Sequence, residues 1–113
     1  MNFGEILAEL RQDRGLLQKD VANIINVSVS TVSNYETGAH YPDVESMIKL
    51  AEYFNVPIDY LLGRTKFRLN FSELNKPLQS GISAADLLNT ILGFKENNVS
   101  SLIEFIELLK LRE

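Results

Sequence analysis

The stretch VSVSTVSNYETG, residues 27–38, decides the fold because its two halves favour different secondary structures. In the first half apolar and polar residues alternate and valine is frequent, a pattern typical of a β-strand. The second half closes with Tyr-Glu-Thr-Gly, and glycine is common just after the end of a helix. The two interpretations lead to different folds and therefore to different functions.

A helix explains this stretch better than a strand does. Ser28 is a good N-cap, Val27 can pack on Val32 as a hydrophobic staple, and Gly38 can end the helix in the left-handed conformation. A strand at the same place would need a partner, and no neighbouring segment has strand character. The sequence therefore predicts a helix here.

Helical spacing divides this predicted helix into two faces. Val32, Tyr35 and Glu36 share one face, which suits packing against the rest of a domain. The opposite face is mostly polar and consists of Val29, Ser30, Ser33 and Asn34. We favour a partner molecule on this polar face over simple solvation, because an exposed valine has no structural purpose there.

Four further short helices are predicted in residues 1–63, at 3–14, 18–25, 44–54 and 58–62. Gly15 can end the first of them, and Asp43 is the expected N-cap of the third. Leu17 stands at the N-cap of the helix that begins at Gln18, where it cannot accept a hydrogen bond. The missing cap costs about 1 kcal/mol.

The C-terminal part is expected to contain a linker and two more helices. Residues 64–81 resemble a linker, in which RTKFRLNF is a candidate extended piece. One helix opens at Ser83, and the last covers about residues 99–112. Its apolar residues are too many for one buried face, so we expect cover from the preceding helix and from a second copy of the chain. The expected dimer contacts are Leu102, Phe105, Ile106 and Leu109.

The predicted fold class is therefore all-α. It comprises a five-helix domain in residues 1–63, the linker in residues 64–81 and a two-helix dimerisation segment in residues 82–113. A chain of 113 residues suits one compact domain, or a small domain with an appendage.

Composition excludes several classes of function. The chain has no cysteine and one histidine, His40, so thiolate metal sites and Ser/His catalytic sites are not expected. There is no Gly-rich phosphate loop and no cluster of metal ligands, so we expect no enzyme, no metal and no cofactor. The N-terminus is acidic and no run of 18 apolar residues occurs, so a soluble cytoplasmic protein without a membrane span is expected.

The charge balance is unfavourable for a nucleic-acid partner. The net charge is −4, and residues 1–63 contain four basic residues against nine acidic ones. Three basic residues alternate in RTKFR, at Arg64, Lys66 and Arg68. They can contact phosphate or simply solvate the linker, and the sequence favours neither.

The stretch GLLQKDVANIINVSVSTVSNYETGAHYPDVESMIKLAEYFNVPIDYLLG, residues 15–63, resembles the Cro and phage-repressor-like (XRE-like) helix-turn-helix family. The shared features include the opening glutamine, the small Ala22, the Val-Ser turn, the aromatic-Glu-x-Gly close and Tyr-Pro. The resemblance covers residues 3–63 and is looser beyond them. Asn26 stands where the family usually has glycine, a mild departure because asparagine tolerates the left-handed region.

The resemblance implies roles for particular residues. Val29, Ser30, Ser33 and Asn34 match positions that read base edges in the major groove, and asparagine can pair with adenine. Arg11 and Glu36 match a structural ion pair, so Arg11 is expected to hold the fold together and not to touch DNA. The positions expected to meet the DNA backbone are Gln18, Thr37, His40 and Tyr41. Gln18 can also be a plain helix-start residue, and His40 an ordinary surface residue.

The sequence is compatible with two functions from different classes. The first is a sequence-specific regulator, a repressor, that binds double-stranded DNA at a pseudo-palindromic operator as a homodimer. The alternative is a protein-interaction module, such as an antitoxin or an antagonist of another regulator, that keeps the fold. Many family members have Arg or Lys where this chain has Val29, Asn34 and Thr37, which favours the alternative. The intact polar face opposes it.

Overall fold

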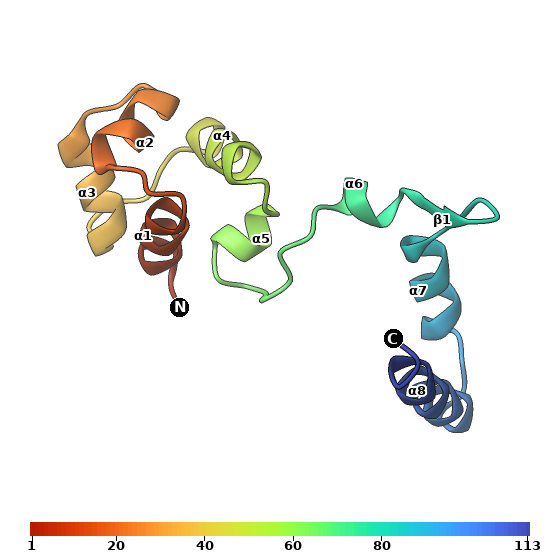
Figure 1. The fold of residues 1–113 in the computed structure, drawn as a ribbon. Helices are drawn as coiled ribbons and strands as arrows, with labels where there is room; N and C mark the ends of the chain where they lie inside the picture. The colour runs from red at the N-terminus through yellow and green to blue at the C-terminus, as the bar shows by residue number, and fades with distance from the viewer. The chain divides into compact units, whose positions relative to one another are not determined.

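The computed structural model describes residues 1–113 and divides them into two compact units, Met1–Phe71 and Ser72–Glu113. Figure 1 shows the elements in chain order, from α1 at the N-terminus to α8 at the C-terminus. The division falls at residues 71 and 72, inside the stretch expected to be a linker. No helix is both long and apolar enough to cross a membrane.

The first unit contains the five predicted helices. They are α1 (Phe3–Asp13), α2 (Gln18–Ile25), α3 (Val29–Thr37), α4 (Val44–Phe54) and α5 (Ile58–Leu61). Residues 27–38 therefore form a helix and not a strand. The Ser28 hydroxyl accepts the N–H of Thr31 at 3.1 Å, and Gly38 ends α3 with φ 84°. This serine cap and this glycine outweigh the alternating valines, because the alternation has no partner strand to pair with.

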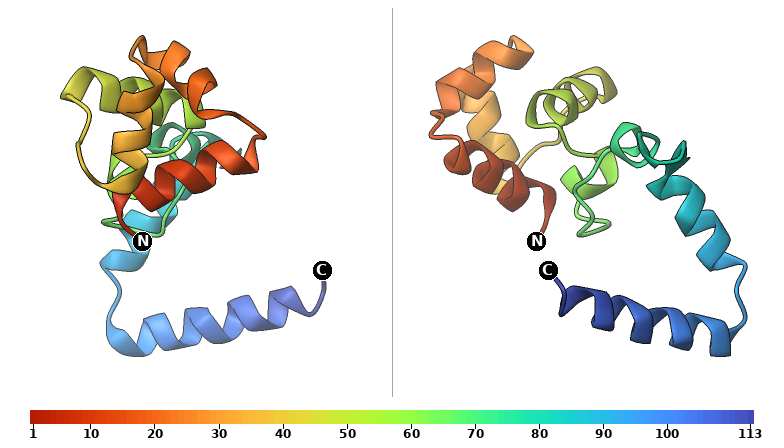
Figure 2. Two further views of the ribbon diagram at one scale, coloured as in Figure 1. Left: turned by 90° about the vertical axis from the view of Figure 1, so that its left-hand side faces the viewer. Right: turned by 45° about the vertical axis from the view of Figure 1, so that its right-hand side comes forward.

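One hydrophobic core holds these helices together. α1 packs on α3 and α5, while α2 packs on α3 and α4, as the two views in Figure 2 also show. Leu7, Val21, Val32, Leu50 and Leu61 are the largest fully buried side chains. Each of the five comes from a different helix, so none of the helices can move away without exposing core surface to water.

α1 and α3 approach each other closely at Gly4. A β-carbon at this position would lie 2.5 Å from the carbonyl oxygen of Glu36 and 2.6 Å from that of Tyr35. Only glycine lets α1 approach the end of α3 so closely. Ala22, the small residue on which the family resemblance partly rests, is also buried, whereas no sequence pattern marked Gly4.

Both ends of α2 have the local structure that the sequence predicted. Asn26 ends α2 at φ 56° and ψ 51°, the left-handed conformation expected of it. At the other end Leu17 makes no side-chain cap, as expected. The carboxylate of Asp20 accepts the N–H of Leu17 at 2.7 Å, so one half of a capping box remains.

The expectation of an all-α fold is wrong in residues 77–83. β1 (Pro77–Gln79) and β2 (Ile82–Ser83) form a small antiparallel hairpin. Ser80 and Gly81 connect them with positive φ angles of 58° and 76°. Two successive positive φ values are what a tight hairpin turn needs, and the Ser-Gly pair was the overlooked signal.

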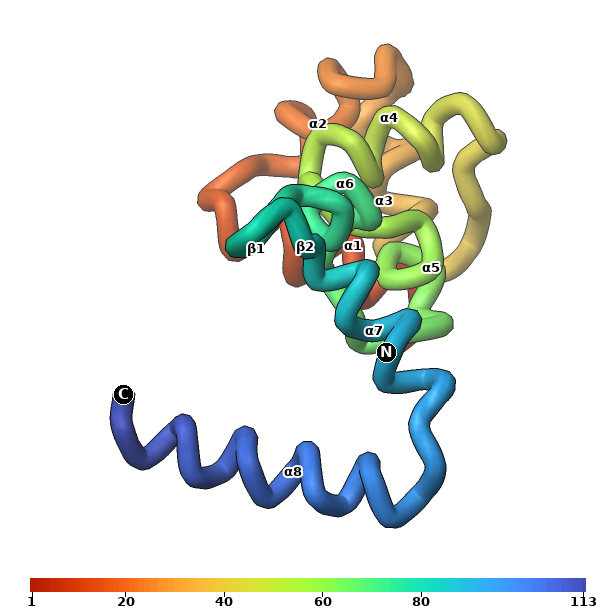
Figure 3. Tube along the Cα trace, turned by 90° about the vertical axis from the view of Figure 1, so that its right-hand side faces the viewer, coloured from red at the N-terminus to blue at the C-terminus, as the bar shows by residue number.

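The linker and the last helix also differ from expectation. A single-turn helix, α6 (Phe71–Leu74), lies in the linker, and RTKFRLNF forms no paired strand. α7 (Ala84–Leu92) begins after Ser83 as predicted, with a capping box between Ser83 and Asp86. α8 (Glu96–Lys110) begins three residues before the predicted Val99, and Figure 3 shows it as one continuous helix.

The second unit has no hydrophobic core. Ser83 is its only buried residue, and neither α7 nor α8 buries a side chain. The expectation that the helix before α8 covers one of its sides is therefore wrong. The apolar side chains of α8 remain accessible, which is an unusual state for a helix with so many of them.

Candidate nucleic-acid interface

The four residues predicted to read bases lie together on the outward side of α3. Val32 and Tyr35 face the core and are 0% and 6% exposed, whereas Val29 on the other side is 46% exposed. Ser30 is exposed, and Ser33 and Asn34 are half-buried. The side of α3 away from the core thus carries one apolar and three polar side chains.

The hydrogen-bonding capacity of this face is partly used within the chain. The Ser30 hydroxyl lies 3.1 Å from that of Ser28, which also bonds to the hydroxyl of Thr31 at 2.7 Å. The side chains of Ser33 and Asn34 make no hydrogen bond within the chain. The amide of Asn34 can therefore both donate to and accept from a base edge, as bidentate recognition of adenine requires.

The residues predicted to meet the DNA backbone have different surroundings. Nε2 of Gln18 donates to Oε1 of Glu36 at 3.1 Å, and the Thr37 hydroxyl donates to the carbonyl oxygen of Asn34 at 3.2 Å. His40 is exposed in the loop after α3. Tyr41 is also exposed, and its ring centroid lies 5.7 Å from that of Phe3. Gln18 and Thr37 thus have one proton each committed inside the protein.

Arg11 and Glu36 form an ion pair between α1 and α3. Nε of Arg11 lies 2.7 Å from Oε2 of Glu36, and a second guanidinium nitrogen lies 3.1 Å from Oε1. A third bond joins the guanidinium to the carbonyl oxygen of Leu16 at 2.8 Å. The hydrogen bond to Glu36 raises the pKa of Arg11 above its ordinary value. The guanidinium of Arg11 thus has its partners within the fold.

Most other basic residues of the first 63 are also occupied. Arg14 donates to the carbonyl oxygen of Tyr53 at 2.9 Å, and Lys49 lies 3.6 Å from Glu45. Lys19, in the first turn of α2, makes no ion pair or hydrogen bond within the chain. Lys19 is one of the four basic residues in residues 1–63, and no sequence pattern indicated a role for it. Lys19 differs from the other three basic residues of this part in that each of those has a partner within the chain.

In the basic segment after α5, Arg64 and Arg68 also have partners within the chain. Arg64 lies 3.8 Å from Asp59, and the guanidinium of Arg68 lies 5.1 Å from the ring centroid of Tyr60. Lys66 has no partner within the chain. These contacts are exposed, so they do not remove the positive charge of the segment from the surface.

The arrangement of α2 and α3 defines the class of protein. Two short helices meet at a tight left-handed turn, and the second buries one side while presenting the other to solvent, which is the geometry of a helix-turn-helix DNA-binding protein.

Comparison with known proteins agrees with this class. The sequence model of the helix-turn-helix family matches residues 7–61. The HTH-type transcriptional regulator ImmR of Bacillus subtilis is 35% identical over 94 residues, which are 81% of this chain and 74% of ImmR. The cryptic phage CTXphi transcriptional repressor RstR of Vibrio cholerae is 35% identical over 68 residues, 60% of this chain and 61% of RstR.

A solved structure extends the similarity to nearly the whole chain. A transcriptional regulator from Listeria innocua superposes with a TM-score of 0.56 at 25% identity, covering 97% of this chain and 94% of that one. The chain therefore belongs to the Cro-like (XRE-like) helix-turn-helix family of DNA-binding transcriptional regulators, as the resemblance in the sequence predicted, and this family is not enzymatic.

Proposed function

We propose that the protein is a repressor that binds a pseudo-palindromic operator as a homodimer. One α3 enters the major groove of each half-site, and the half-sites lie about 34 Å apart, or a multiple of that distance. Residues 1–63 bind DNA, residues 64–81 connect, and residues 82–113 form the dimer. The outward side of α3 is the observation that carries this proposal.

On that side each residue has a chemically suitable target. The free amide of Asn34 pairs with adenine, and Ser30 and Ser33 bond to either kind of base edge. Val29, nearly half exposed beside these polar groups, packs against a thymine methyl. A surface that only needs solubility would gain nothing from a valine at this place.

Contacts to the DNA backbone hold the helix in register. Gln18 keeps one amide hydrogen for a phosphate after its bond to Glu36, and Lys19 adds a free charge beside it. His40 and Tyr41 offer further donors, while Thr37 must turn its hydroxyl away from Asn34 to donate. Because each copy has few cations, its affinity for DNA is modest. Linking two copies in a dimer multiplies that affinity.

The dimer forms through one side of α8, which we name the dimer face. Its members follow an i, i+3, i+4, i+7 spacing and are half-buried or exposed in one copy: Leu102, Phe105, Ile106 and Leu109. Because the second unit has no core, pairing of two such faces supplies the apolar contact that the unit lacks.

Selection from a randomised duplex pool at low salt tests the proposal. Sequencing of the bound fraction should reveal an enriched pseudo-palindrome with a recurring adenine in each half. A folded dimer that enriches no sequence would contradict the proposal.

A second candidate function is an interaction module that binds another protein. The observation in its favour is that Arg11, Arg14 and Lys49 all have partners within the chain, which leaves Lys19 as the free cation of the first 63 residues. Titration of duplex DNA at increasing salt separates the two functions. A DNA-binding regulator loses affinity steeply as salt rises, whereas a protein-interaction module binds duplex weakly at every salt concentration.

A further inference from the structure

The basic segment after α5 is part of the first unit, although a linker was expected there. Residues 64–71 lie within that unit. The backbone N–H of Arg64 donates to the carbonyl oxygen of Asp59 at 2.8 Å, and the side-chain nitrogen of Asn70 donates to the side-chain oxygen of Asn55 at the end of α4. The basic residues of this segment are therefore held on the helix-turn-helix unit.

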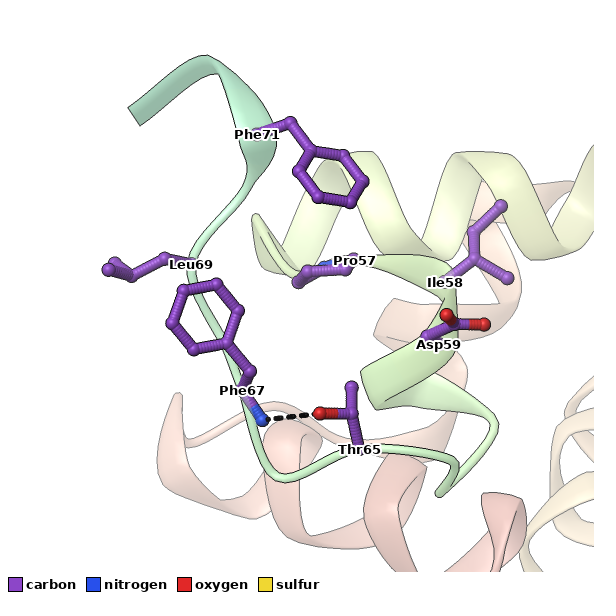
Figure 4. Close-up of a pocket in the computed structure, with 7 residues that line it drawn as sticks. All are labelled: Pro57, Ile58, Asp59, Thr65, Phe67, Leu69 and Phe71. Carbon is purple, nitrogen blue, oxygen red and sulfur yellow. Dashed lines mark hydrogen bonds between the residues drawn. The ribbon is translucent and has the colours of Figure 1, made fainter. Parts of the chain in front are cut away.

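The side chains of this segment alternate between two surfaces. Four of them line an apolar groove beside α5, which Figure 4 shows: Thr65, Phe67, Leu69 and Phe71. Lys66 and Arg68, which stand between them in the sequence, line a different hollow. Successive side chains of an extended backbone point to opposite sides, so the order RTKFR brings two cations to one surface.

We name this second hollow, of about 290 Å³, the basic hollow. Its lining consists of Lys66 and Arg68 together with Met1, Ile6, Tyr60, Gly63 and Thr65. No carboxylate is among these residues, in a chain whose net charge is −4. An anion in the hollow would therefore meet positive charge without a competing negative one.

The polar groups of the basic hollow have protons left to donate. Lys66 makes no ion pair or hydrogen bond within the chain, and the guanidinium of Arg68 rests 5.1 Å from the ring centroid of Tyr60 without an ion pair. The Thr65 hydroxyl oxygen accepts the N–H of Phe67 at 3.1 Å, which leaves the hydroxyl proton free. Three donors around one hollow suit an anion that has several oxygens, such as a phosphate.

The basic hollow lies beside the first turn of α1, and so does the loop predicted to meet the DNA backbone. Met1 and Ile6 line the hollow. Phe3, which stands between them in the chain, packs on Tyr41 of that loop with the ring centroids 5.7 Å apart. The start of α1 thus connects the hollow to a surface that already carries predicted phosphate contacts.

The exposure of the basic hollow favours a phosphate of bound DNA over a free anion. Lys66 and Arg68 are exposed, and exposed ion pairs contribute little because water competes with them. A phosphate in a duplex that α3 already holds is different, because the second contact is then intramolecular and its effective concentration is high.

We propose that the basic hollow binds a phosphate of the DNA backbone outside the bases that α3 reads. Lys66 and Arg68 neutralise the phosphate, and the Thr65 hydroxyl donates to one of its oxygens. The inference rests on the DNA binding proposed above and adds a phosphate site to it. It also offsets the shortage of free cations in residues 1–63, because both cations of the hollow come from the segment that follows.

Lys66→Gln tests the contact, and the fold should persist because the Lys66 side chain has no partner in the chain. Affinity for the selected operator should fall about two- to fivefold for each copy bound. The slope of log affinity against log salt should become shallower by about 1 for each copy. Lys66→Arg keeps the charge and should bind like the unchanged protein. An unchanged affinity and slope for Lys66→Gln overturns the proposal.

Lys95→Gln is the matched control. It removes the same charge from an exposed lysine of the second unit that has no ion pair, and it should leave both affinity and slope unchanged. Equal losses for Lys95→Gln and Lys66→Gln would mean that only the net charge matters, which overturns the proposal.

Neutral methylphosphonate linkages, placed one at a time through the operator, locate the phosphate. At one position in each half-site the neutral linkage should weaken binding of the unchanged protein but should not weaken Lys66→Gln any further. The absence of any such position contradicts a direct contact and overturns the proposal.

Two further measurements distinguish other occupants of the basic hollow. Inorganic phosphate titrated into the DNA-free protein should bind more weakly than about 1 mM. Sedimentation should give the same self-association for Lys66→Gln as for the unchanged protein. Tight phosphate binding that Lys66→Gln removes, or weaker self-association of this variant, would assign the hollow to a free anion or to a second copy and overturn the proposal.

These outcomes separate this inference from the proposed function. A protein that enriches an operator, with Lys66→Gln binding it equally well, refutes the phosphate site and leaves the regulator intact. A protein that binds no duplex refutes both.

Discussion

Nε of Arg11 lies 2.7 Å from Oε2 of Glu36, and this bond ties α1 to α3. The two side chains are 13% and 9% exposed, so the pair is largely shielded from water. Gln18 completes the network by donating to the same carboxylate at 3.1 Å. The orientation of α3 thus depends on a network of charged and polar groups within the first unit.

Removing one partner of this pair should be costly. Arg11→Met leaves the Glu36 carboxylate poorly compensated in a shielded place, and we expect a loss of about 3 kcal/mol in the free energy of unfolding. Urea denaturation measures it. Lys49→Met is the control, because its pair with Glu45 is exposed and should contribute at most about 0.5 kcal/mol. Equal losses for the two variants would contradict the structural role of Arg11.

A methyl group at position 4 should separate α1 from α3. Gly4→Ala puts a β-carbon against two backbone carbonyls that cannot turn aside, and we expect a loss of about 1–3 kcal/mol in unfolding free energy. The control is Gly93→Ala, where the nearest atom outside the adjacent residues would be 3.5 Å away and the backbone φ is negative. Thermal unfolding should show a lower midpoint for Gly4→Ala alone.

Asn34→Ala should relax sequence preference at one base pair in each half-site. The fold should persist, because the Asn34 side chain makes no bond within the chain, and the lost discrimination should be about 1–3 kcal/mol. Binding to the selected operator and to duplexes substituted at single positions measures it. An equal loss of affinity for all sequences would mean that Asn34 does not read a base. Asn23→Ala, on an exposed position of α2, is the control for surface substitution.

Acid should weaken the start of α4. The carboxylate of Asp43 accepts the N–H of Ser46 at 2.8 Å, and this hydrogen bond holds the pKa of Asp43 below its ordinary value of 3.8. A carboxylate whose pKa is lowered by folding stabilises the fold above the unfolded pKa, and the contribution is lost as pH falls through the folded pKa.

The contribution of Asp43 should therefore be complete above about pH 4 and decline below it. Urea denaturation between pH 3 and pH 6 should show a smaller acid loss for Asp43→Asn, which keeps the cap but not the charge. Asp13→Asn serves as control, because Asp13 makes no side-chain bond within the chain. An unchanged pH profile for Asp43→Asn would contradict this role.

Charges on the dimer face should give a monomer. Phe105→Asp with Leu109→Asp places two carboxylates in the proposed α8 contact, where burial of unpaired charge is strongly unfavourable. Light scattering should report half the mass of the unchanged protein. Ser100→Asp with Ser101→Asp adds the same charge to exposed positions of the same helix and should stay dimeric. A Phe105/Leu109 variant that stays dimeric would place the interface elsewhere.

Local chemistry determined the helix-turn-helix part of the protein. Ser28, Asn26 and Gly38 set the ends of α2 and α3 through a hydroxyl acceptor and left-handed backbone, so both helices were predictable from neighbouring residues. The two faces of α3 follow from helical spacing alone. These features depend on residues close in the chain, and sequence patterns report such interactions well.

Only the tertiary structure decided which groups are free and which are committed. Lys19 and Arg14 look alike in the sequence, yet Arg14 caps the end of α4 from 39 residues away and Lys19 remains open. Gly4 became informative only when the carbonyls of Tyr35 and Glu36 were placed beside it. The apolar faces of α8 are likewise uncovered because α7 does not bury them. Each of these depends on contacts between residues distant in the chain, which no local pattern encodes.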